Sequence, residues 1–337
     1  MRTIPLRTPE EIAARAGRET PVLHLPVRAE VFAERELRLR ELAAGHAMRD
    51  YLLLLAELTR AQHELLQDHP GVPLPDEQAL QAAVSAAKPP LPAELWPRDP
   101  CWRAGLQRLL DALQARLPEG PARSTVVALR ELEPQLLEQQ ADRLLNGITL
   151  GLDLASAPFI AAALQVYWTH MVLATQAAHG AERLAPFGRI EDATRCPCCG
   201  FVPVASVARI DAGSGGLRYL QCALCATQWH MVRVKCSHCE STRGIHYESL
   251  ERIDGDAGTG AGIDVGPGSK PTIEAETCDE CGSYLKIVRR DRDPQAEAVA
   301  DDLASLTLDL LVAEAGFQRH GANLLLLFGE PDDGGGG

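Results

Sequence analysis

The sequence predicts an α+β protein: an N-terminal all-helical bundle domain, two tandem rubredoxin-like or zinc-ribbon-like β modules and a C-terminal helix. Apolar residues recur at helical spacing through about the first 190 residues. Four Cys-x-x-Cys pairs follow, set among short β-branched and aromatic runs that Gly-rich turns separate. Near Ala298 the helical pattern returns. We therefore expect domains at residues 1–190, 191–230, 231–290 and 291–325, and a flexible tail at residues 326–337.

The N-terminal domain is expected to consist of helices that end at proline or glycine. Residues 28–69 show an amphipathic pattern, and residues 76–88 form a second helical run that ends at two prolines. A third helix is expected near residues 102–117. The sequence then predicts one long helix, with Ser124 as its N-cap and Gly147 at its C-terminal end.

Residues 154–181 carry no charged side chain, and a helix of this length could span a bilayer. Pro158, Gln165 and His170 interrupt the apolar run, however, and no basic flank marks a cytoplasmic side. We interpret this segment as the central buried helix of the bundle and expect no membrane insertion. The C-terminal helix is expected to pack through one apolar stripe, formed by Leu303, Leu306, Leu310 and Phe317.

Nine of the ten cysteines lie between residues 196 and 281, and eight of them form Cys-x-x-Cys pairs. The tight turn of such a pair lets both sulfurs reach one ion at about 2.3 Å. Two pairs complete one tetrahedral site, so the four pairs predict two metal ions per chain. The predicted ligands are Cys196, Cys199, Cys222, Cys225, Cys236, Cys239, Cys278 and Cys281.

The segments between the pairs predict which pairs share an ion. The segment from Cys199 to Cys222 contains two strand-like runs around a Gly-rich turn, and the longer segment from Cys239 to Cys278 repeats this plan. Both are expected to be hairpins that return the chain to its starting point. Residues 226–235 contain no Gly, Pro or Asn, and as a strand they would extend roughly 30 Å at about 3.3 Å per residue. The pairs should therefore combine in sequential order.

Four thiolates leave no open coordination position, so we interpret both sites as structural and not catalytic. Redox-active dithiols are the alternative, and tetrahedral sulfur ligation suits iron as well as zinc.

Cys198 is interpreted as a bystander that cannot turn inward, with a reactive thiol as the alternative. Cys101 is interpreted as a buried free cysteine. His230 and His238 are interpreted as groups beside the ligands or at the surface.

Composition narrows the classes of function. A net charge of -13 and a pI near 5.3 argue against a protein that coats nucleic acid or an anionic membrane. The N-terminus lacks the apolar core of a secretory signal, so we expect a cytoplasmic protein. In that reducing compartment the cysteines are not expected to form a disulfide framework, and the paired cysteines indicate metal ligands first and redox dithiols second. No hydrolase or dehydrogenase motif is present, and we expect that the protein is not an enzyme.

Four segments carry a resemblance: "RCPCCGFVPVASVARI", "GLRYLQCALCATQWHMVRVKCSHCE", "ETCDECGSYLK" and "ADDLASLTLDLLVAEAGFQRHG". In this order they resemble the formate dehydrogenase accessory protein family, FdhE. The resemblance covers about residues 190–322, and the helical part before it fits the family's plan with weaker signatures. The combination of four pairs with "TQWHMVRVKC" and "ADDLASLTLD" is far more specific than any single pair.

The resemblance implies a cytoplasmic maturation factor that binds the catalytic subunit of respiratory formate dehydrogenases before their twin-arginine export and is needed for their activity. It also implies rubredoxin-like iron at the eight paired cysteines, with zinc as a second candidate. A homodimer is compatible with it. The sequence departs from the pattern in the extra thiol of Cys198 and in the long Gly-rich loop at residues 254–271, and neither departure removes a ligand.

Two other functions compete. A zinc-ribbon protein that binds nucleic acid has some support, since residues 189–250 contain seven Lys or Arg against five acids. That surplus is small and the whole chain repels phosphate, so we expect no nucleic-acid partner. A redox protein that reduces its client through iron–thiolate centres is the other alternative, because iron bound by four thiolates can change its oxidation state.

An interaction surface is expected on one face of the β modules. Aromatic and guanidinium groups of the kind that anchor protein interfaces gather there in the sequence. The alternative is that the arginines are ordinary solvated strand residues. The predicted surface comprises Trp229, Tyr219, Arg218, Arg233 and Tyr284.

Overall fold

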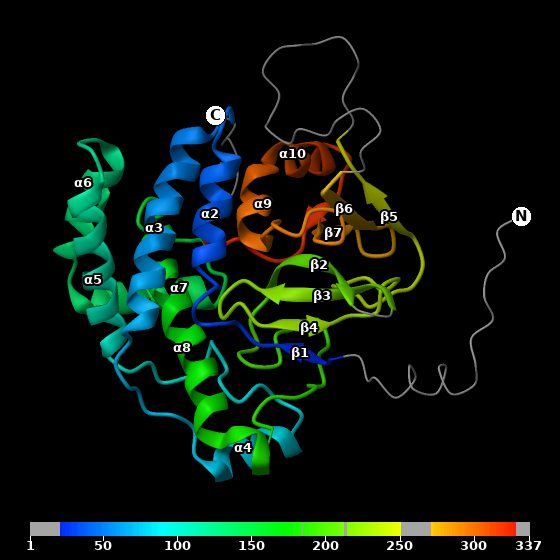
Figure 1. The fold of residues 1–337 in the computed structure, drawn as a ribbon, viewed down its shortest axis with the longest axis horizontal. Helices are drawn as coiled ribbons and strands as arrows, with labels where there is room; N and C mark the ends of the chain where they lie inside the picture. The colour runs from blue at the N-terminus through cyan, green and yellow to red at the C-terminus, as the bar shows by residue number, and fades with distance from the viewer. Residues whose placement is uncertain (1–20, 184, 212–213, 251–270, 328–337) are drawn as a thin grey trace, which may run out of the picture.

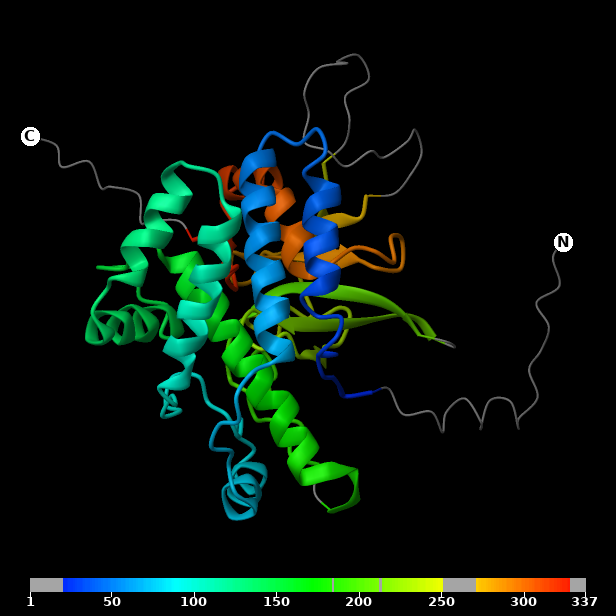
Figure 2. The ribbon, with the colours of Figure 1, turned by 60° about the vertical axis from the view of Figure 1, so that its left-hand side comes forward.

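A computed structural model describes residues 21–183, 185–211, 214–250 and 271–327. Helices occupy one side of the molecule (left in Figure 1), and a mixed β-sheet covered by two short helices occupies the other. The long helix α8 (Ala157–Arg183) runs between the two halves, as Figure 2 shows. The predicted α+β class is confirmed. Residues 328–337 of the predicted tail and residues 251–270, which contain most of the Gly-rich loop, lie outside the described residues.

Helix α8 forms the centre of the helical half. Among the described helices that precede it, it packs against α3, α5 and α7, and its residues Ile160, Leu164 and Trp168 have no exposed surface. Within it, the stretch Ala157–His179 is long and apolar enough to cross a membrane, but 83% of that apolar window is buried inside the protein. The predicted buried central helix is confirmed. The preceding helices are α2 (Ala33–Leu42), α3 (Arg49–Gln67), α4 (Glu77–Ser85), α5 (Cys101–Arg116), α6 (Pro121–Arg130) and α7 (Pro134–Leu145).

The long helix predicted from Ser124 to Gly147 is wrong, because α6 and α7 replace it. Pro134 is the cause: it lacks an N–H, and its ring excludes the helical conformation at the residue before it. Glu133 accordingly has an extended ψ of 137°, and α7 begins at Pro134. Ser124 is no N-cap; it lies inside α6, where its hydroxyl donates a hydrogen bond of 3.2 Å to the carbonyl of Gly120.

The amphipathic pattern at residues 28–69 corresponds to two helices, α2 and α3, and not to one. The chain turns between them at Gly45, whose φ of +73° favours glycine. The N-terminal domain also contains a strand, which the sequence analysis missed. This strand, β1 (Leu23–His24), pairs antiparallel with a strand of the first cysteine-containing unit, so the chain begins its described part in the sheet.

Eight strands form one sheet in the described part of the chain, in the order β1-β4-β3-β2-β7-β6-β5, with β8 also paired to β7. The hairpins β2–β3 and β5–β6 are present as predicted. The unexpected feature is a parallel pairing of β2 with β7, which places Ser206 opposite Ile287 and joins the two units into one sheet. The bounds are β2 (Pro203–Asp211), β3 (Ser214–Cys222), β4 (Gln228–His230), β5 (Ile245–Glu248), β6 (Ile273–Cys278), β7 (Ser283–Arg289) and β8 (Gln318–Arg319).

The extended strand expected at residues 226–235 is wrong in length, because only Gln228–His230 form a strand. The chain then bends toward Cys236 without any Gly or Pro. The guanidinium of Arg218 explains the bend, since it donates to the carbonyls of Val232 and Lys235 at 3.2 Å and 2.7 Å. A side chain from β3 thus satisfies the backbone of this turn.

The predicted interaction surface is also wrong. Trp229, Tyr219, Arg218 and Tyr284 are at most 4% exposed, and of the five residues only Arg233 lies at the surface. Arg218 is buried because Glu276, on β6, places a carboxylate oxygen 2.6 Å from its guanidinium. Burial raises the pKa of Glu276 to about 7, although the charge of Arg218 opposes this rise. The pair spans the parallel junction between the two units.

The C-terminal helix predicted within residues 291–325 consists of two short helices, α9 (Ala298–Ala304) and α10 (Leu306–Glu314), which break at Ser305. The predicted apolar stripe therefore fails. Leu303 is buried, but Leu310 is 59% exposed, and Leu308 and Val312 face the interior instead. The break allows acidic residues of both helices to point into the protein.

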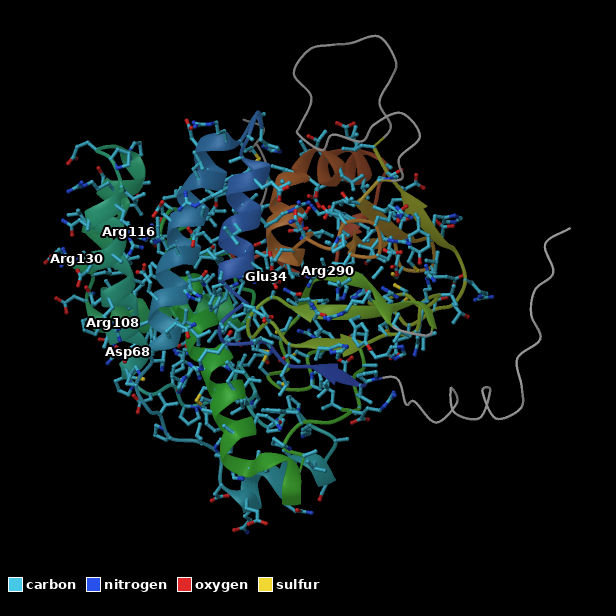
Figure 3. The ribbon with its side chains drawn as sticks, in the orientation of Figure 1. Glu34, Asp68, Arg108, Arg116, Arg130 and Arg290 are labelled. Atoms are coloured by element: carbon cyan, nitrogen blue, oxygen red, sulfur yellow. The ribbon has the colours of Figure 1, made fainter. Side chains whose placement is uncertain are left out.

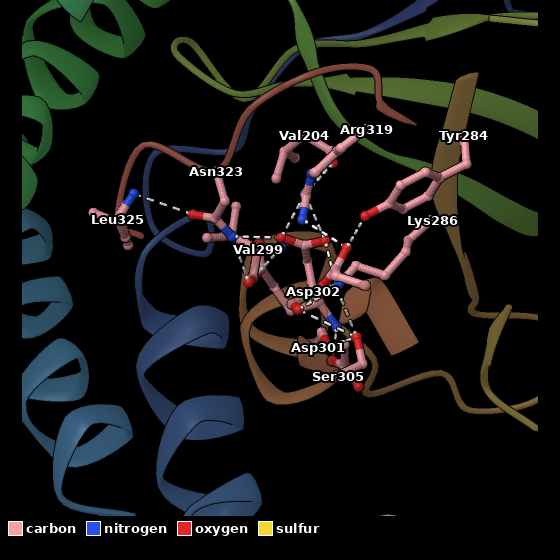
Figure 4. A network of polar contacts seen from close by, with 12 residues as sticks. Val204, Tyr284, Lys286, Val299, Asp301, Asp302, Ser305, Arg319, Asn323 and Leu325 are labelled. Carbon is pink, nitrogen blue, oxygen red and sulfur yellow. Dashed lines mark hydrogen bonds and ion pairs between the residues drawn. The ribbon is translucent and has the colours of Figure 1, made fainter. Parts of the chain in front are cut away.

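These acidic residues belong to a buried ionic network, which Figure 4 shows. Lys286 lies 3.0 Å from Asp302 and 2.5 Å from Asp309, and Arg319 lies 2.8 Å and 3.1 Å from the same two carboxylates. Lys286 and Asp302 are at most 2% exposed. Although burial acts to raise it, the charges of Arg319 and Lys286 hold the pKa of Asp302 below its usual value. Two cations and two anions balance in the interior.

A second set of ion pairs ties helix α2 to α9. Arg38 donates to both carboxylate oxygens of Asp301, at 2.9 Å and 2.7 Å, and lies 2.8 Å from Asp293. Arg35 lies 3.2 Å from Glu297, whose carboxylate also caps the start of α9. The pairs of Arg38 with Asp301 and of Arg35 with Glu297 are buried, unlike those on the outer helices labelled in Figure 3, such as Arg108 with Asp68.

We predict that Lys286→Met destabilises the protein by roughly 3–5 kcal/mol, because it leaves the buried Asp302 and Asp309 with one cation instead of two. The matched control is Arg108→Met, which removes an exposed ion pair and should cost about 1 kcal/mol or less. Urea denaturation of both variants measures the difference. Equal losses of stability would contradict the prediction.

Candidate metal centres

Eight cysteine sulfurs form two separate groups. We call Cys196, Cys199, Cys222 and Cys225 centre 1, and Cys236, Cys239, Cys278 and Cys281 centre 2. In each group the four sulfur atoms lie within 4.8 Å of one another. The structure thus brings the pairs together in the sequential order that the hairpin argument predicted. Whether these sulfurs ligate a metal stays a prediction.

The distances fit a tetrahedral ion. In centre 1, the sulfur of Cys199 lies 3.4 Å from that of Cys222 and 3.6 Å from that of Cys225. In centre 2, the two closest pairs of sulfurs, one from each Cys-x-x-Cys turn, are 3.8 Å apart. Bonds of about 2.3 Å to a tetrahedral ion place the sulfurs about 3.8 Å from one another. Both groups can therefore hold zinc or iron.

The same backbone turn builds all four pairs. In three of them the amide of the first cysteine donates to the carbonyl five residues later, as Cys196 does to Phe201 at 3.0 Å. The residue after the second cysteine always has a positive φ, at Gly200 (+72°), Ala226 (+59°), Glu240 (+60°) and Gly282 (+66°). Ala226 and Glu240 adopt this conformation at a steric cost, so the convergence of the sulfurs imposes the turn.

Centre 1 is completely enclosed, because all four of its cysteines are at most 1% exposed. Burial raises the pKa of Cys196, Cys199 and Cys222 well above that of a free thiol. Burial also acts to raise the pKa of Cys225, but hydrogen bonds to the neighbouring cysteines lower it. Several thiolates could persist in this dry space only with a cation among them, which a metal ion would supply.

Centre 2 lies at the surface. Cys236 and Cys278 are buried, but Cys281 is partly exposed and Cys239 is exposed. Burial raises the pKa of Cys236 to about 12. Beside this centre, the rings of His238 and His320 lie 4.6 Å apart. The two centres therefore share their turns and differ in access to solvent.

The helical half contacts both turns of centre 1. The amides of Leu91 and Ala93 donate to the carbonyls of Cys198 and Cys199 at 3.0 Å and 2.8 Å. From α8, the side-chain amide of Gln165 donates to the carbonyl of Ala223, between Cys222 and Cys225, at 2.8 Å. Centre 1 thus lies at the joint between the helices and the sheet.

Gln165 is a structural link to centre 1 that sequence reasoning did not recognise. Its side-chain oxygen accepts a hydrogen bond of 2.9 Å from Gln62 of α3, so a polar chain crosses the apolar core from α3 to centre 1. The signal was visible, because Gln165 interrupts an apolar run of a buried helix. A buried amide needs hydrogen-bond partners, which predicts a polar contact at that position.

The remaining candidate residues have other roles. Cys198 belongs to neither sulfur group, as expected of a bystander, but its side chain is buried inside the protein with no exposed surface. The Thr227 hydroxyl donates to its sulfur at 3.5 Å. Burial raises the pKa of Cys198, which disfavours a reactive thiolate. Cys101 is only partly buried, at the first position of α5. His230 is partly buried, His238 is exposed, and neither belongs to the two sulfur groups.

The fold and the two centres define a class of protein in which a helical domain precedes paired tetracysteine centres that share one sheet. The chain matches family models described as "FdhE, N-terminal" over residues 20–184, "FdhE, central domain" over residues 195–233 and "FdhE, C-terminal domain" over residues 234–326. It therefore belongs to the FdhE family, as the resemblance predicted.

Known relatives agree with this assignment. The "Protein FdhE homolog" of Cronobacter sakazakii is 38% identical over 330 residues, which cover 98% of this chain and 99% of the relative. The "Protein FdhE" of Salmonella paratyphi A is 40% identical over 313 residues, or 92% of each chain. The crystal structure of the FdhE protein from Pseudomonas aeruginosa has a TM-score of 0.75 and 39% identity, and the match covers 92% of this chain and 100% of that one.

We predict that a chelator removes metal from the loaded protein in two kinetic phases, with centre 2 releasing its ion first. Cys239 is exposed to the chelator, whereas the sulfurs of centre 1 are enclosed, and we expect rates that differ on the order of tenfold or more. A colorimetric chelator follows the release. Cys239→Ser should remove the fast phase alone, and a single phase in the unsubstituted protein would contradict the prediction.

Proposed function

We propose that this protein is a cytoplasmic maturation factor that binds the catalytic subunit of formate dehydrogenase and is needed for its assembly into active enzyme. The observation that carries the proposal is a pair of four-thiol centres in a chain of the FdhE family. Ligation by all four sulfurs would leave no open coordination position for substrate. This closure supports a binding role rather than an enzymatic one.

The proposed ligands are the eight cysteines of centres 1 and 2, with two metal ions per chain. Iron is the favoured occupant and zinc is the alternative, since both accept four thiolates in tetrahedral geometry. The test of the whole proposal is co-purification of the protein with the catalytic subunit, with metal analysis of the same sample. A protein that binds two ions per chain but never retains the subunit would overturn it.

We predict that Cys196→Ser combined with Cys199→Ser removes one ion per chain and leaves centre 2 filled. Because centre 1 also holds the helices against the sheet, this variant should lose the contact between the two halves and become sensitive to proteases. The matched control, Cys236→Ser with Cys239→Ser, should lose the other ion and keep that contact. Metal analysis and limited proteolysis measure both effects, and loss of both ions or of neither would count against separate centres.

A redox function is the second candidate, and the exposure of Cys239 favours it, since an iron centre near solvent is accessible to an electron-transfer partner. Zinc has no accessible change of oxidation state, so replacing iron by zinc separates the two candidates. The binding role predicts that the zinc form still binds and matures formate dehydrogenase. A zinc form that binds its client but fails to activate it would favour the redox role.

We propose no nucleic-acid partner, because the net charge of -13 opposes binding to phosphate. The absence of a gel shift at physiological ionic strength is the expected result. We propose a homodimer as the assembly state to test, and analytical sedimentation is the measurement that tests it.

A further inference from the structure

Two cavities adjoin each other along the joint between the helical half and the first hairpin. Their volumes are ≈ 330 Å³ and ≈ 340 Å³, and Glu94, Arg195 and Phe201 line both of them. We call the two cavities together the seam groove. Phe201 and Leu324 are buried among its lining residues, and Leu95 and Ile148 contribute side chains that are largely open to solvent.

The apolar residues at the groove are unusually exposed. Leu95 is 83% exposed and Ile148 is 46% exposed, and Leu150, which is 83% exposed, follows on the loop between α7 and α8. Arg143 of the groove lining donates to the carbonyl of Leu150, so this loop borders the groove. Single exposed leucines need no explanation, but several of them beside a hollow indicate an interaction site.

Arg195 places a positively charged side chain in the lining of the seam groove. Its side chain is partly buried, and among the described residues its guanidinium makes no hydrogen bond or ion pair. Arg143, in the same cavity, uses one nitrogen on Leu150 and leaves its buried Nε without a partner. Glu94 is the one described carboxylate that lines this cavity and it is exposed, so the two guanidinium groups outnumber the acids here. A partly buried cation of this kind favours a carboxylate from a binding partner.

The balance of positive and negative side chains differs between the two cavities. The second cavity is lined by three acids, Glu94, Glu191 and Asp192, against the two bases Lys88 and Arg195. The first cavity is lined by Arg143 and Arg195 against Glu94 alone. The carboxylate of a partner should therefore lie over the first cavity, near Arg195. The apolar side chains of the partner would occupy the space beside Leu95 and Ile148.

We propose that the seam groove binds a segment of a protein partner that presents apolar side chains beside an acidic side chain. The partner is the catalytic subunit of formate dehydrogenase, and this choice rests on the function proposed above. Two open, mainly apolar hollows in a row suit the side chains of a peptide segment better than a single small molecule, which prefers one enclosed cavity.

The groove also depends on centre 1. Cys199 and Gly200 line its second cavity, and the carbonyl of the neighbouring Phe201 accepts the hydrogen bond from Cys196 that closes the metal turn. The shape of the groove is therefore coupled to the folded state of centre 1. Partner binding should be lost together with the ion of that centre and kept when centre 2 is emptied.

The experiment measures the Kd of the metal-loaded, full-length protein for the purified catalytic subunit. Leu95→Asp combined with Ile148→Asp should weaken binding at least about tenfold, as expected for anchor residues at an interface. The matched control is Leu37→Asp, which changes a leucine that is 70% exposed on α2 and does not line the groove. This control should bind within about twofold of the unsubstituted protein.

A second variant tests the carboxylate. Arg195→Gln should weaken binding several-fold and reduce its dependence on salt, because an ion pair is removed. Metal content and thermal unfolding confirm that each variant is folded. Unchanged binding by the Leu95→Asp, Ile148→Asp variant would overturn the groove and leave the proposed function standing, whereas absence of binding by the unsubstituted protein would overturn both.

Discussion

The convergence of four sulfur atoms in a dry interior is the constraint on which the rest of the structure depends. Centre 1 fixes the turn that contains Cys199 and the turn that begins at Cys222, and these two turns flank the hairpin β2–β3 in the sheet. The carbonyls of the same turns accept hydrogen bonds from the helical half. Coordination by a tetrathiolate is worth roughly 10 kcal/mol or more, comparable with the whole stability of a typical domain. An ion bound in centre 1 would therefore be part of the core that stabilises the protein.

The parallel pairing of β2 with β7 places both centres in one sheet, but the two centres differ in their exposure to solvent. It makes one sheet from two units that could each have been a separate module, and Arg218 crosses the junction to reach Glu276. A buried ion pair is weak evidence of stability, but it favours one alignment of the units over others. The turns of centre 1 accept hydrogen bonds from the helical half as well as lying in the sheet, whereas centre 2 faces the solvent.

Patterns over short stretches of the sequence correctly predicted the structural features that depend on residues close together in the chain. The grouping of the cysteines followed from turn residues in the long spacers, and the burial of α8 followed from its lack of charge. The split at Pro134 was also local, and the proline rule would have found it. The break at Ser305 and the burial of Arg218 were not predictable, because their causes, Lys286 and Glu276, lie in other strands of the sheet. At both Ser305 and Arg218, a residue far away in the sequence determines the local structure.

The ionic network around Lys286 has a consequence for how the chain is made. Its partners Asp302, Asp309 and Arg319 all follow Lys286 in the sequence, and β8 completes the sheet only at Gln318–Arg319. During synthesis, the helices and the first hairpin emerge early, but β7 carries an uncompensated ammonium group until Asp302 and Asp309 have left the ribosome, and its edge is completed only by β8. An interrupted chain would therefore present an open strand edge and a charged interior to the proteases of the cell, so that only finished molecules persist.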